Sequence, residues 1–408
     1  MAAVATTVTL LSGGSVVAAA EDSSYSGQVG PNGQQCSQPA AETYRAVPWA
    51  QQRLAANRVW PLTRGEGVTV AVIDSGVDGS VPQLRGRVVS GVDVVNGGGA
   101  ADTDCFGHGT FVAGIIAAQS TTGTGVAGLA PGVTILPIRQ ANNANDGTSA
   151  GMAQAIRVAA DAGARVINIS ASSFFPSPEL EQAVRYATDK DVLIVAAVSN
   201  DAQGGNSKTY PAAYPQVLAV GAVGPDGRRT DFSETGDFLD LVAPGDKVIS
   251  LSRGGPGHVM DSGTSYAAPF VAAVAALVRA YHPELTAAQV VRRLELTADH
   301  PGTRLPDPQL GWGVVNPYAA VCEVLPGEQG DRAVIAAGPG QIHPPARVAE
   351  DTSPLRHAAL FIAGAVGLAG LGMFLGVAVP RGMRRRWRPA RTSIHLGQNG
   401  QRGQWSQP

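Results

Sequence analysis

Asp74, His108 and Ser265 are three side chains whose types can combine into a nucleophilic catalyst. Asp74 ends the apolar run 70–73, His108 lies between two glycines, and Ser265 follows the small residues 262–264. A serine hydroxyl becomes nucleophilic when a histidine takes its proton, and a buried carboxylate orients the imidazole and stabilises its cation. The order Asp, His, Ser along the chain is one of the known solutions to this geometry.

Each of these residues also has an ordinary structural explanation when it is considered alone. Asp74 could cap a turn, His108 could be a hydrogen-bonded core histidine, and Ser265 could cap a helix. The combination favours catalysis, because three complementary groups stand at the ends of regular elements, where small neighbours let a substrate approach. A helix that begins at Ser265 also places backbone N–H groups near a developing oxyanion.

The elements that must position these residues follow from the apolar pattern between Gly67 and Tyr318. Continuous Val/Ile runs predict strands covered on both faces, and their alternation with amphipathic helices predicts an α/β domain with a mostly parallel sheet. The predicted strands are 68–73, 134–138, 165–169, 192–197 and 217–223. The predicted helices are 111–118, 151–162, 178–190, 265–281 and 286–297. In such domains functional residues collect at the carboxyl ends of the strands.

Three blocks that contain the candidate residues resemble the signature blocks of the subtilase family. They are AVIDSG at 71–76, HGTFVAG at 108–114 and GTSYAAPFV at 263–271. Further similar blocks lie at 125–131, 210–215, 241–245 and 311–316, so that the resemblance covers about residues 65–320. The resemblance implies a subtilisin-like three-layer fold with helices on both faces of the sheet. It also implies a serine endopeptidase with Asp74, His108 and Ser265 as its triad. An α/β-hydrolase esterase is disfavoured, because its triad follows a different order.

The same resemblance assigns two further parts of the site. Asn200 corresponds to the asparagine whose side chain completes the oxyanion hole, and Ser170, Ala171 and Ser172 correspond to the strand that binds the substrate. The family usually has Ala-Gly before the asparagine and Ser-Leu-Gly-Gly in the strand. This chain has Val-Ser and Ser-Ala-Ser-Ser instead. Added side chains restrict the backbone where a peptide would lie as an extra strand. We therefore expect a narrow, selective cleft.

A closer resemblance is to the mycosins, the membrane-anchored subtilases of type VII secretion systems. It rests on the order of segments along the chain and on Cys105, which stands just before the histidine block. The resemblance implies a disulfide between Cys36 and Cys105, an N-terminal extension that wraps around the core without filling the cleft, and type VII secretion membrane components as partners. Cys322 is then unpaired.

The termini indicate export and membrane anchoring. Residues 1–20 resemble a signal peptide, 21–63 form the extension, 64–325 the protease domain and 326–356 a Pro/Gly-rich linker. Residues 357–380 contain a long uncharged stretch that predicts a transmembrane helix, and the Arg-rich segment 381–408 follows it. The positive-inside rule places this basic tail in the cytoplasm and the protease domain outside.

Composition excludes some partners and leaves two roles open. The formal net charge is −2, so that nothing in the overall charge attracts nucleic acid. The sequence has no compact Asp/Asn/Glu loop with calcium-ligand spacing, and we expect neither a required metal nor a cofactor. One role is a peptidase that processes exported proteins or peptides. The other is a structural component that caps or stabilises a type VII secretion complex, with proteolysis secondary.

The insert 140–149, rich in Asn, predicts an exposed loop near the cleft.

Overall fold

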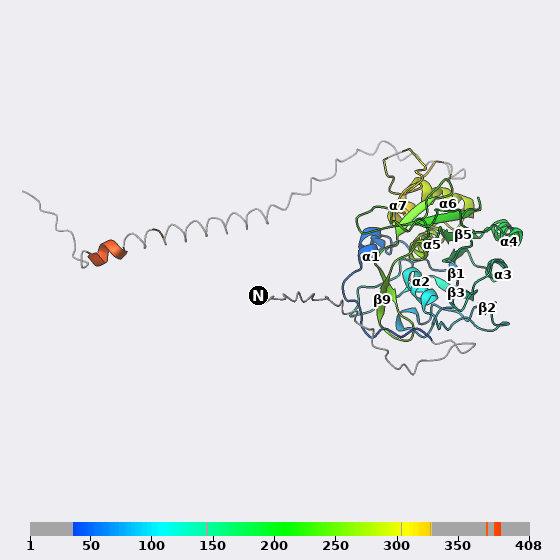
Figure 1. Cartoon of the computed structure of the whole chain (residues 1–408), viewed down its shortest axis with the longest axis horizontal. Helices are drawn as coiled ribbons and strands as arrows, with labels where there is room; N and C mark the ends of the chain where they lie inside the picture. Colours follow the sequence, from blue (N-terminus) through cyan, green and yellow to red (C-terminus); the bar gives the residue numbers. More distant parts are fainter. Residues whose placement is uncertain are drawn as a thin grey trace, which may run out of the picture. The chain divides into compact units, whose positions relative to one another are not determined.

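The structure is a computed structural model that describes residues 36–143, 146–302, 304–326, 328, 373 and 379–384. The chain divides into two compact units, 1–332 and 333–408. The described residues of the first unit form an α/β domain (Figure 1). The predicted fold class is therefore confirmed for this unit.

The centre of the domain is a seven-stranded sheet in which every neighbouring pair is parallel. Its strand order is β2-β3-β1-β4-β5-β6-β7, so that the first long strand lies in the middle. Each predicted strand is present, with bounds shifted by no more than a residue or so. The strands are β1 Thr69–Asp74, β2 Val92–Asp93, β3 Thr134–Arg139, β4 Val166–Ile169, β5 Leu193–Ala197, β6 Val217–Val223 and β7 Leu241–Pro244.

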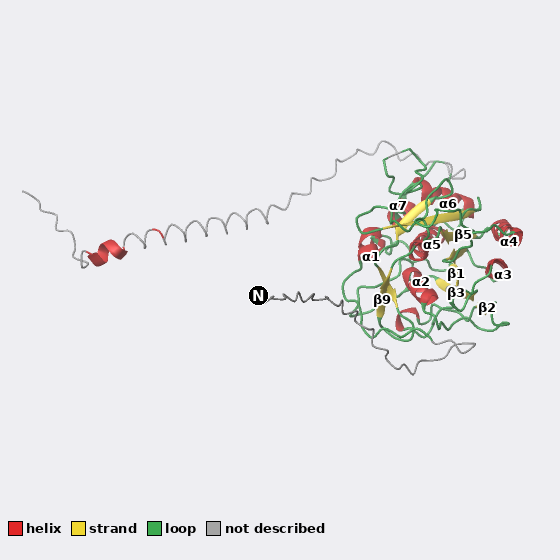
Figure 2. Ribbon diagram, in the orientation of Figure 1, coloured by secondary structure: helices red, strands yellow, loops and turns green. Residues whose placement is uncertain are grey.

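Both faces of the sheet are covered, which explains the unbroken runs of apolar residues. Along β1, Val70 and Val72 pack into one core with the helices α2 (His108–Ala117) and α5 (Thr264–Tyr281). Ala71 and Ile73 pack into a second core with α3 (Ser149–Asp161) and α4 (Pro178–Asp189). All four side chains are fully buried. The three layers are visible as helices on either side of the strands (Figure 2).

The helices agree with the sequence pattern except at some ends and in short elements. The main helices are α2 His108–Ala117, α3 Ser149–Asp161, α4 Pro178–Asp189, α5 Thr264–Tyr281 and α6 Ala287–Leu296. Helix α2 begins at His108 and not at the predicted Phe111, because side chains from outside the helix satisfy its first turn. The pattern missed the short helices and a two-stranded antiparallel hairpin. They are α1 Trp49–Leu54, α7 Pro317–Cys322, β8 Val248–Leu251 and β9 His258–Asp261. The 3-10 turns η2 Ala56–Arg58 and η3 Pro82–Leu84 complete the set.

The described part of the N-terminal extension lies on the core. The indole of Trp49 donates to the carbonyls of Asp246 and Lys247, and the indole of Trp60 donates to the carbonyl of Leu129. Leu54 is buried in the core formed with α2 and α5. The extension therefore contributes apolar side chains to the same core that positions the candidate site.

The predicted transmembrane segment 357–380 lies outside the described residues except at Met373, Val379 and Pro380, which are helical. Among the described residues, one helix, α5, is long and apolar enough to cross a membrane, and 83% of it is buried within the domain. Residues 1–20 also lie outside the described part of the chain. The signal peptide and the anchor stay predictions.

Candidate active site

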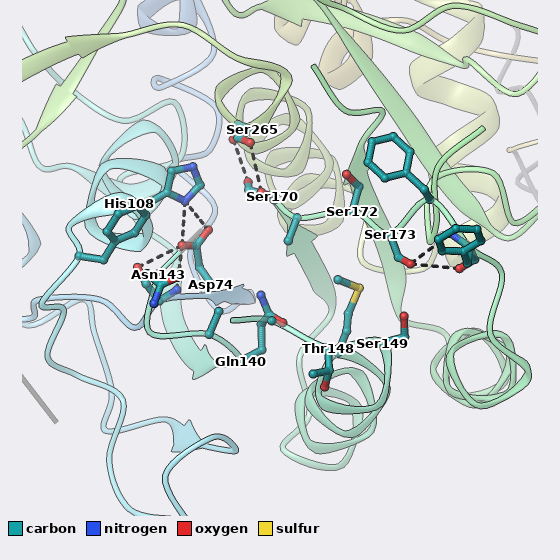
Figure 3. Close-up of a pocket in the computed structure, with 18 residues that line it drawn as sticks. Asp74, His108, Gln140, Asn143, Thr148, Ser149, Ser170, Ser172, Ser173 and Ser265 are labelled. Atoms are coloured by element: carbon teal, nitrogen blue, oxygen red, sulfur yellow. Dashed lines mark hydrogen bonds and ion pairs between the residues drawn. The ribbon is translucent and has the colours of Figure 1, made fainter. Parts of the chain in front are cut away.

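The structure brings Asp74, His108 and Ser265 to one cleft of about 480 Å³ (Figure 3). Asp74 is the last residue of β1, His108 the first of α2, and Ser265 lies in the first turn of α5. The cleft therefore opens where the central strand ends and two helices begin. The predicted substrate strand also borders it, through Ser170, Ala171 and Ser172 (the first of these just beyond the end of β4).

Asp74 and His108 form a close pair. Nδ1 of His108 lies 2.8 and 2.9 Å from the two carboxylate oxygens of Asp74. Burial lowers the pKa of His108, but the charge and hydrogen bond of Asp74 outweigh it, and the pKa is raised above its usual value. The helix packs tightly against β1 because Gly109 has no side chain: a Cβ there would lie 2.0 Å from the carbonyl oxygen of Gly76. The pair therefore has the geometry of a base oriented by a carboxylate.

Ser265 makes a different contact. Its Oγ donates to the backbone carbonyl of Ser170 at 3.1 Å, and Oγ of Ser170 donates back to the carbonyl of Ser265 at 2.8 Å. Among the residues that the structure describes, no hydrogen bond joins Ser265 to His108. The hydroxyl must therefore rotate away from Ser170 before His108 can take its proton.

Asn200 is oriented by the residue that precedes Ser265. Its Oδ1 accepts hydrogen bonds from N and Oγ1 of Thr264, at 2.8 and 3.0 Å. This occupies the acceptor and leaves the Nδ2 donor turned towards Gly263, where an added Cβ would lie 3.2 Å from it. Asn200 is not among the residues that line the cleft.

Aromatic side chains that the sequence reasoning missed surround these groups. The ring of Tyr266 lies 5.3 Å from the ring of His108, and its hydroxyl donates to Asp261 at 2.5 Å. Burial raises the pKa of Tyr266 above its usual value, and the hydrogen bond and charge of Asp261 raise it as well. Phe174 and Phe175 line the cleft although they are 48% and 78% exposed. Tyr266 belongs to the GTSYAAPFV block, and its position directly after Ser265 was a usable signal.

The insert 140–149 is only partly the exposed loop that we expected. Gln140 is 5% exposed and Ala141 is 6% exposed. They follow directly after β3, and the N–H of Gln140 donates a hydrogen bond to the carbonyl of Asp74, which keeps this part of the insert against β1. Ser149 also lines the cleft and stands in a G-x-S-x-G segment, 147–151. It lies at the start of α3, and no hydrogen bond links it to a histidine among the described residues.

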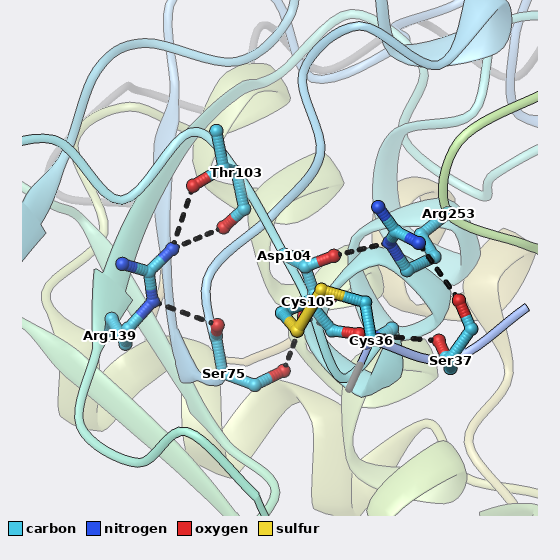
Figure 4. Close-up of a disulfide and its surroundings, with 9 residues drawn as sticks. Cys36, Ser37, Ser75, Thr103, Asp104, Cys105, Arg139 and Arg253 are labelled. Atoms are coloured by element: carbon cyan, nitrogen blue, oxygen red, sulfur yellow. Dashed lines mark hydrogen bonds between the residues drawn. A yellow bond between two sulfur atoms is a disulfide. The ribbon is translucent and has the colours of Figure 1, made fainter. Parts of the chain in front are cut away.

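The disulfide between Cys36 and Cys105 is present, with an S–S distance of 2.07 Å (Figure 4). It joins the start of the described extension to the loop just before His108. Ser37 reinforces the link, because its N–H donates to the carbonyl of Cys105 at 2.9 Å. Cys322 carries a free thiol of intermediate exposure. In the described part of the chain, no group of three or more His, Cys, Asp or Glu side chains is arranged to hold a metal ion.

Comparisons with known proteins give similarities along most of the chain. Residues 65–313 match the model of the Subtilase family (peptidase S8). Mycosin-4 of Mycobacterium tuberculosis (strain ATCC 25618 / H37Rv) is 38% identical over 411 residues, which cover 88% of this chain and 87% of that protein. Thermitase of Thermoactinomyces vulgaris is 35% identical over 275 residues, covering 67% of this chain and 95% of thermitase. Among solved structures, the MycP3 protease from the type VII (ESX-3) secretion system superimposes with a TM-score of 0.62 at 35% identity, covering 71% of this chain and 93% of that one.

Proposed function

The chain belongs to the subtilase family of serine endopeptidases and is related to the mycosins, and from this premise we propose that it is a membrane-anchored peptidase that processes type VII secretion substrates outside the cytoplasm. The relationship to a protease of the type VII (ESX-3) system supports the choice of substrates. The signal peptide 1–20, the anchor 357–380 and the cytoplasmic tail 381–408 belong to this proposal.

The observation that carries the proposal is the hydrogen-bonded Asp74–His108 pair, which shares a cleft with Ser265. In the proposed reaction, Oγ of Ser265 attacks the scissile carbonyl carbon, and its proton passes to Nε2 of His108. The carbonyl π electrons move to the oxygen, and Nδ2 of Asn200 donates to this oxyanion. His108 then gives the proton to the leaving amine as the C–N bond breaks. A water molecule, deprotonated by His108, then attacks the acyl carbon, and the bond from this carbon to Oγ of Ser265 breaks as His108 returns the proton to Oγ.

The substrate chain is proposed to lie along Ser170, Ala171 and Ser172 as an added strand. A bound peptide supplies N–H donors to backbone carbonyls in this mode of recognition. A substrate N–H that donates to the carbonyl of Ser170 would compete with the present bond from Ser265 Oγ to that carbonyl, at 3.1 Å. Substrate binding would therefore favour rotation of the Ser265 hydroxyl towards His108.

Labelling of the full-length chain with a fluorophosphonate probe tests the proposal. We expect the wild type to be labelled and the Ser265→Ala variant not to be labelled. Ser262→Ala is the matched control, because Ser262 is exposed and bonded to Lys247 and Asp246 at the edge of the same segment, and labelling should persist. A folded wild type that the probe does not label would contradict the proposal.

A structural role in a type VII secretion complex is the second candidate. It is favoured by the resting contact of Ser265 with Ser170 in place of His108. Substrate processing and secretion separate the two roles when both are measured in cells that carry Ser265→Ala and in cells that lack the whole chain. Loss of substrate processing in both supports the peptidase. Loss of secretion only in the deletion supports the structural component.

A further inference from the structure

A second buried carboxylate lies next to the candidate triad. Asp104 is 3% exposed and precedes Cys105 of the disulfide. Its pKa is raised by burial, and the charge of Asp74 adds to this, while hydrogen bonds to its oxygens act in the opposite direction. A carboxylate in such a position is costly unless its oxygens are satisfied by donors.

Four donors converge on the Asp104 carboxylate. Oδ1 accepts from N of Gly107 at 2.8 Å and from Oγ of Ser75 at 2.9 Å. Oδ2 accepts from N and Oγ1 of Thr110, at 2.9 and 2.7 Å. Two of these donors are backbone N–H groups at the start of α2, the helix that carries His108. Gly107, the N-cap residue of that helix, has no side chain to cap it, so that Asp104 satisfies these donors from outside the helix.

The bond to Ser75 connects Asp104 to the other half of the pair. Oγ of Ser75 lies 2.9 Å from Oδ1 of Asp104 and 3.2 Å from Oδ1 of Asp74, and it also accepts from N of Gly109 at 3.1 Å. The single hydroxyl hydrogen is therefore shared between two carboxylates. Any displacement of Asp104 changes the donors that Asp74 receives and the first turn that holds His108.

The disulfide and Arg253 hold Asp104 itself in place (Figure 4). Nε of Arg253 donates to the carbonyl of Asp104 at 2.6 Å, and Nη1 donates to the carbonyl of Ser37 at 2.8 Å. On the other side, Nη2 of Arg139 donates to the carbonyl and hydroxyl of Thr103. The backbone that carries the Asp104 side chain is thus held from the extension, from the residues that follow β8 and from β3.

We infer that Asp104 is a positioning residue, which holds Asp74 through Ser75 and His108 through the first turn of α2. The inference rests on the proposed function for the roles of Asp74 and His108. An Asn at position 104 has one acceptor and one NH₂ group in place of two acceptor oxygens, so that its NH₂ would face the N–H donors of Gly107 or Thr110. The helix start would then shift, and small displacements of catalytic groups lower turnover strongly.

The charge of Asp104 gives the inference a readout that a purely structural role would not change. The carboxylates that raise the pKa of His108 are those of Asp74, Asp104 and Asp261, in descending order, against the opposing effect of burial. The guanidinium groups of Arg139 and Arg253 contact backbone carbonyls of the same loop and remain in the variant. Removing the Asp104 charge should therefore move the His108 titration to lower pH.

The experiment uses the full-length chain and two measurements. One is the rate of fluorophosphonate labelling between pH 5 and pH 9, and the other is the NMR titration of the His108 imidazole. We expect Asp104→Asn to lower the labelling rate by about 10- to 100-fold and to move both titration midpoints to lower pH. Ser75→Ala, which removes the shared hydroxyl without removing a charge, should lower the rate less.

Asp78→Asn is the matched control. Asp78 is also a buried aspartate of the same region, at 7% exposure, and accepts from Ser80 and from N of Gly254 without touching Asp74 or His108. It should lower stability without moving the midpoint. If Asp104→Asn behaves like Asp78→Asn, or keeps the wild-type rate and midpoint, the inference is wrong. If Asp104→Asn does not fold, Ser75→Ala decides.

Failure of this inference is distinct from failure of the proposed function. A wild type that is not labelled contradicts the proposed function, whereas the NMR titration still reports whether Asp104 acts on His108. A labelled wild type with unchanged variants contradicts only the positioning role.

Discussion

Two regions beside the candidate active site are held in opposite ways. On the histidine side, Oδ1 of Asp74 receives three donor contacts, and the disulfide is close by. On the oxyanion side, Ser199 has a φ of 88° although it is not a glycine, and both carboxylate oxygens of the fully buried Glu234 lack a partner among the described residues. The histidine side consists of Asp74, Ser75, Asp104 and His108, and the oxyanion side of Ser199, Asn200, Thr209 and Glu234.

The difference follows the charges that each side must hold. The Asp74 carboxyl group is buried and belongs to the site at every stage, so that fixed donors are needed throughout the cycle. The oxyanion beside Asn200 exists only during reaction, and a backbone held in an uncommon conformation costs about 1–3 kcal/mol at all times. Thr209 connects the strained backbone to the buried acid, because its hydroxyl donates to the carbonyl of Val198 at 2.7 Å and Glu234 lies beside it. Strain and an unsatisfied carboxyl thus coincide where charge is transient.

The largest expected effect comes from the histidine side. Asp74→Asn should lower turnover by about 10⁴-fold, because the amide can no longer hold the imidazole in the productive tautomer. The check is turnover of a peptide that the wild type cleaves, with thermal unfolding as the measure of folding. Asp78→Asn again serves as control. Turnover within tenfold of the wild type would show that Asp74 is not the orienting group.

Asn200→Ala should have a smaller effect on turnover, about 10²–10³-fold, because one of several oxyanion donors is lost. Binding of a substrate-like inhibitor should be nearly unchanged, since the donor acts on charge that develops in the transition state. The same peptide assay and an inhibition constant measure both quantities. A rise in KM with normal kcat would mean that Asn200 contacts the ground-state substrate instead.

Glu234 should make the oxyanion side sensitive to pH. Burial, followed by the charge of Asp201, raises the pKa of Glu234 to about 7 in the folded chain. The folded state therefore keeps a proton that the unfolded state releases near pH 4.5. The contribution of Glu234 to the free energy of unfolding is fully present below pH 4.5 and is lost as the pH rises through about 7. The Glu234→Gln variant should lack this loss, which amounts to about 3 kcal/mol between pH 4.5 and pH 8.

Chemical unfolding of the wild type and Glu234→Gln at several pH values gives the difference directly. Glu295 on α6 provides a comparison, because burial also raises its pKa to about 7 at a place away from the cleft. Glu295→Gln should reduce the pH dependence with the same sign. Parallel curves for the wild type and Glu234→Gln would show that Glu234 is ionised at neutral pH and has a partner in solution.

The smallest expected effect is on the backbone of the oxyanion side. Ser199→Gly removes a side chain from a left-handed backbone position and so relieves backbone strain in the folded state. Glycine also adds entropy to the unfolded chain, but the relief of strain is larger, so that the free energy of unfolding should rise by about 1 kcal/mol. Unfolding by denaturant measures it. Ser177→Gly, at an N-cap with extended backbone, is a control in which glycine relieves no strain and should not stabilise. A loss of stability in Ser199→Gly would show that contacts of the Ser199 side chain stabilise the fold by more than the backbone strain costs.

Sequence alone predicted most of the sheet and the candidate triad, because each depends on local signals. Runs such as 217–223 are apolar throughout, as a strand buried on both faces requires. The predicted start of α2 was wrong because the carboxylate that caps the helix, Asp104, lies outside it and is brought to its first turn by the folded loop. The contact of Ser265 with Ser170 joins residues 95 positions apart, and the isolation of Glu234 is a property of everything packed around it. No local pattern reports either.

The disulfide between Cys36 and Cys105 has a consequence for the connectivity of a cleaved chain. These cysteines are 69 residues apart and close a covalent ring that contains Asp74. A single cut between them opens the ring but releases nothing, so that a nicked molecule migrates as one piece until its thiols are reduced. A single cut can therefore release only the part of the extension that precedes Cys36, and a nick inside the ring leaves Asp74 and His108 in one covalent molecule.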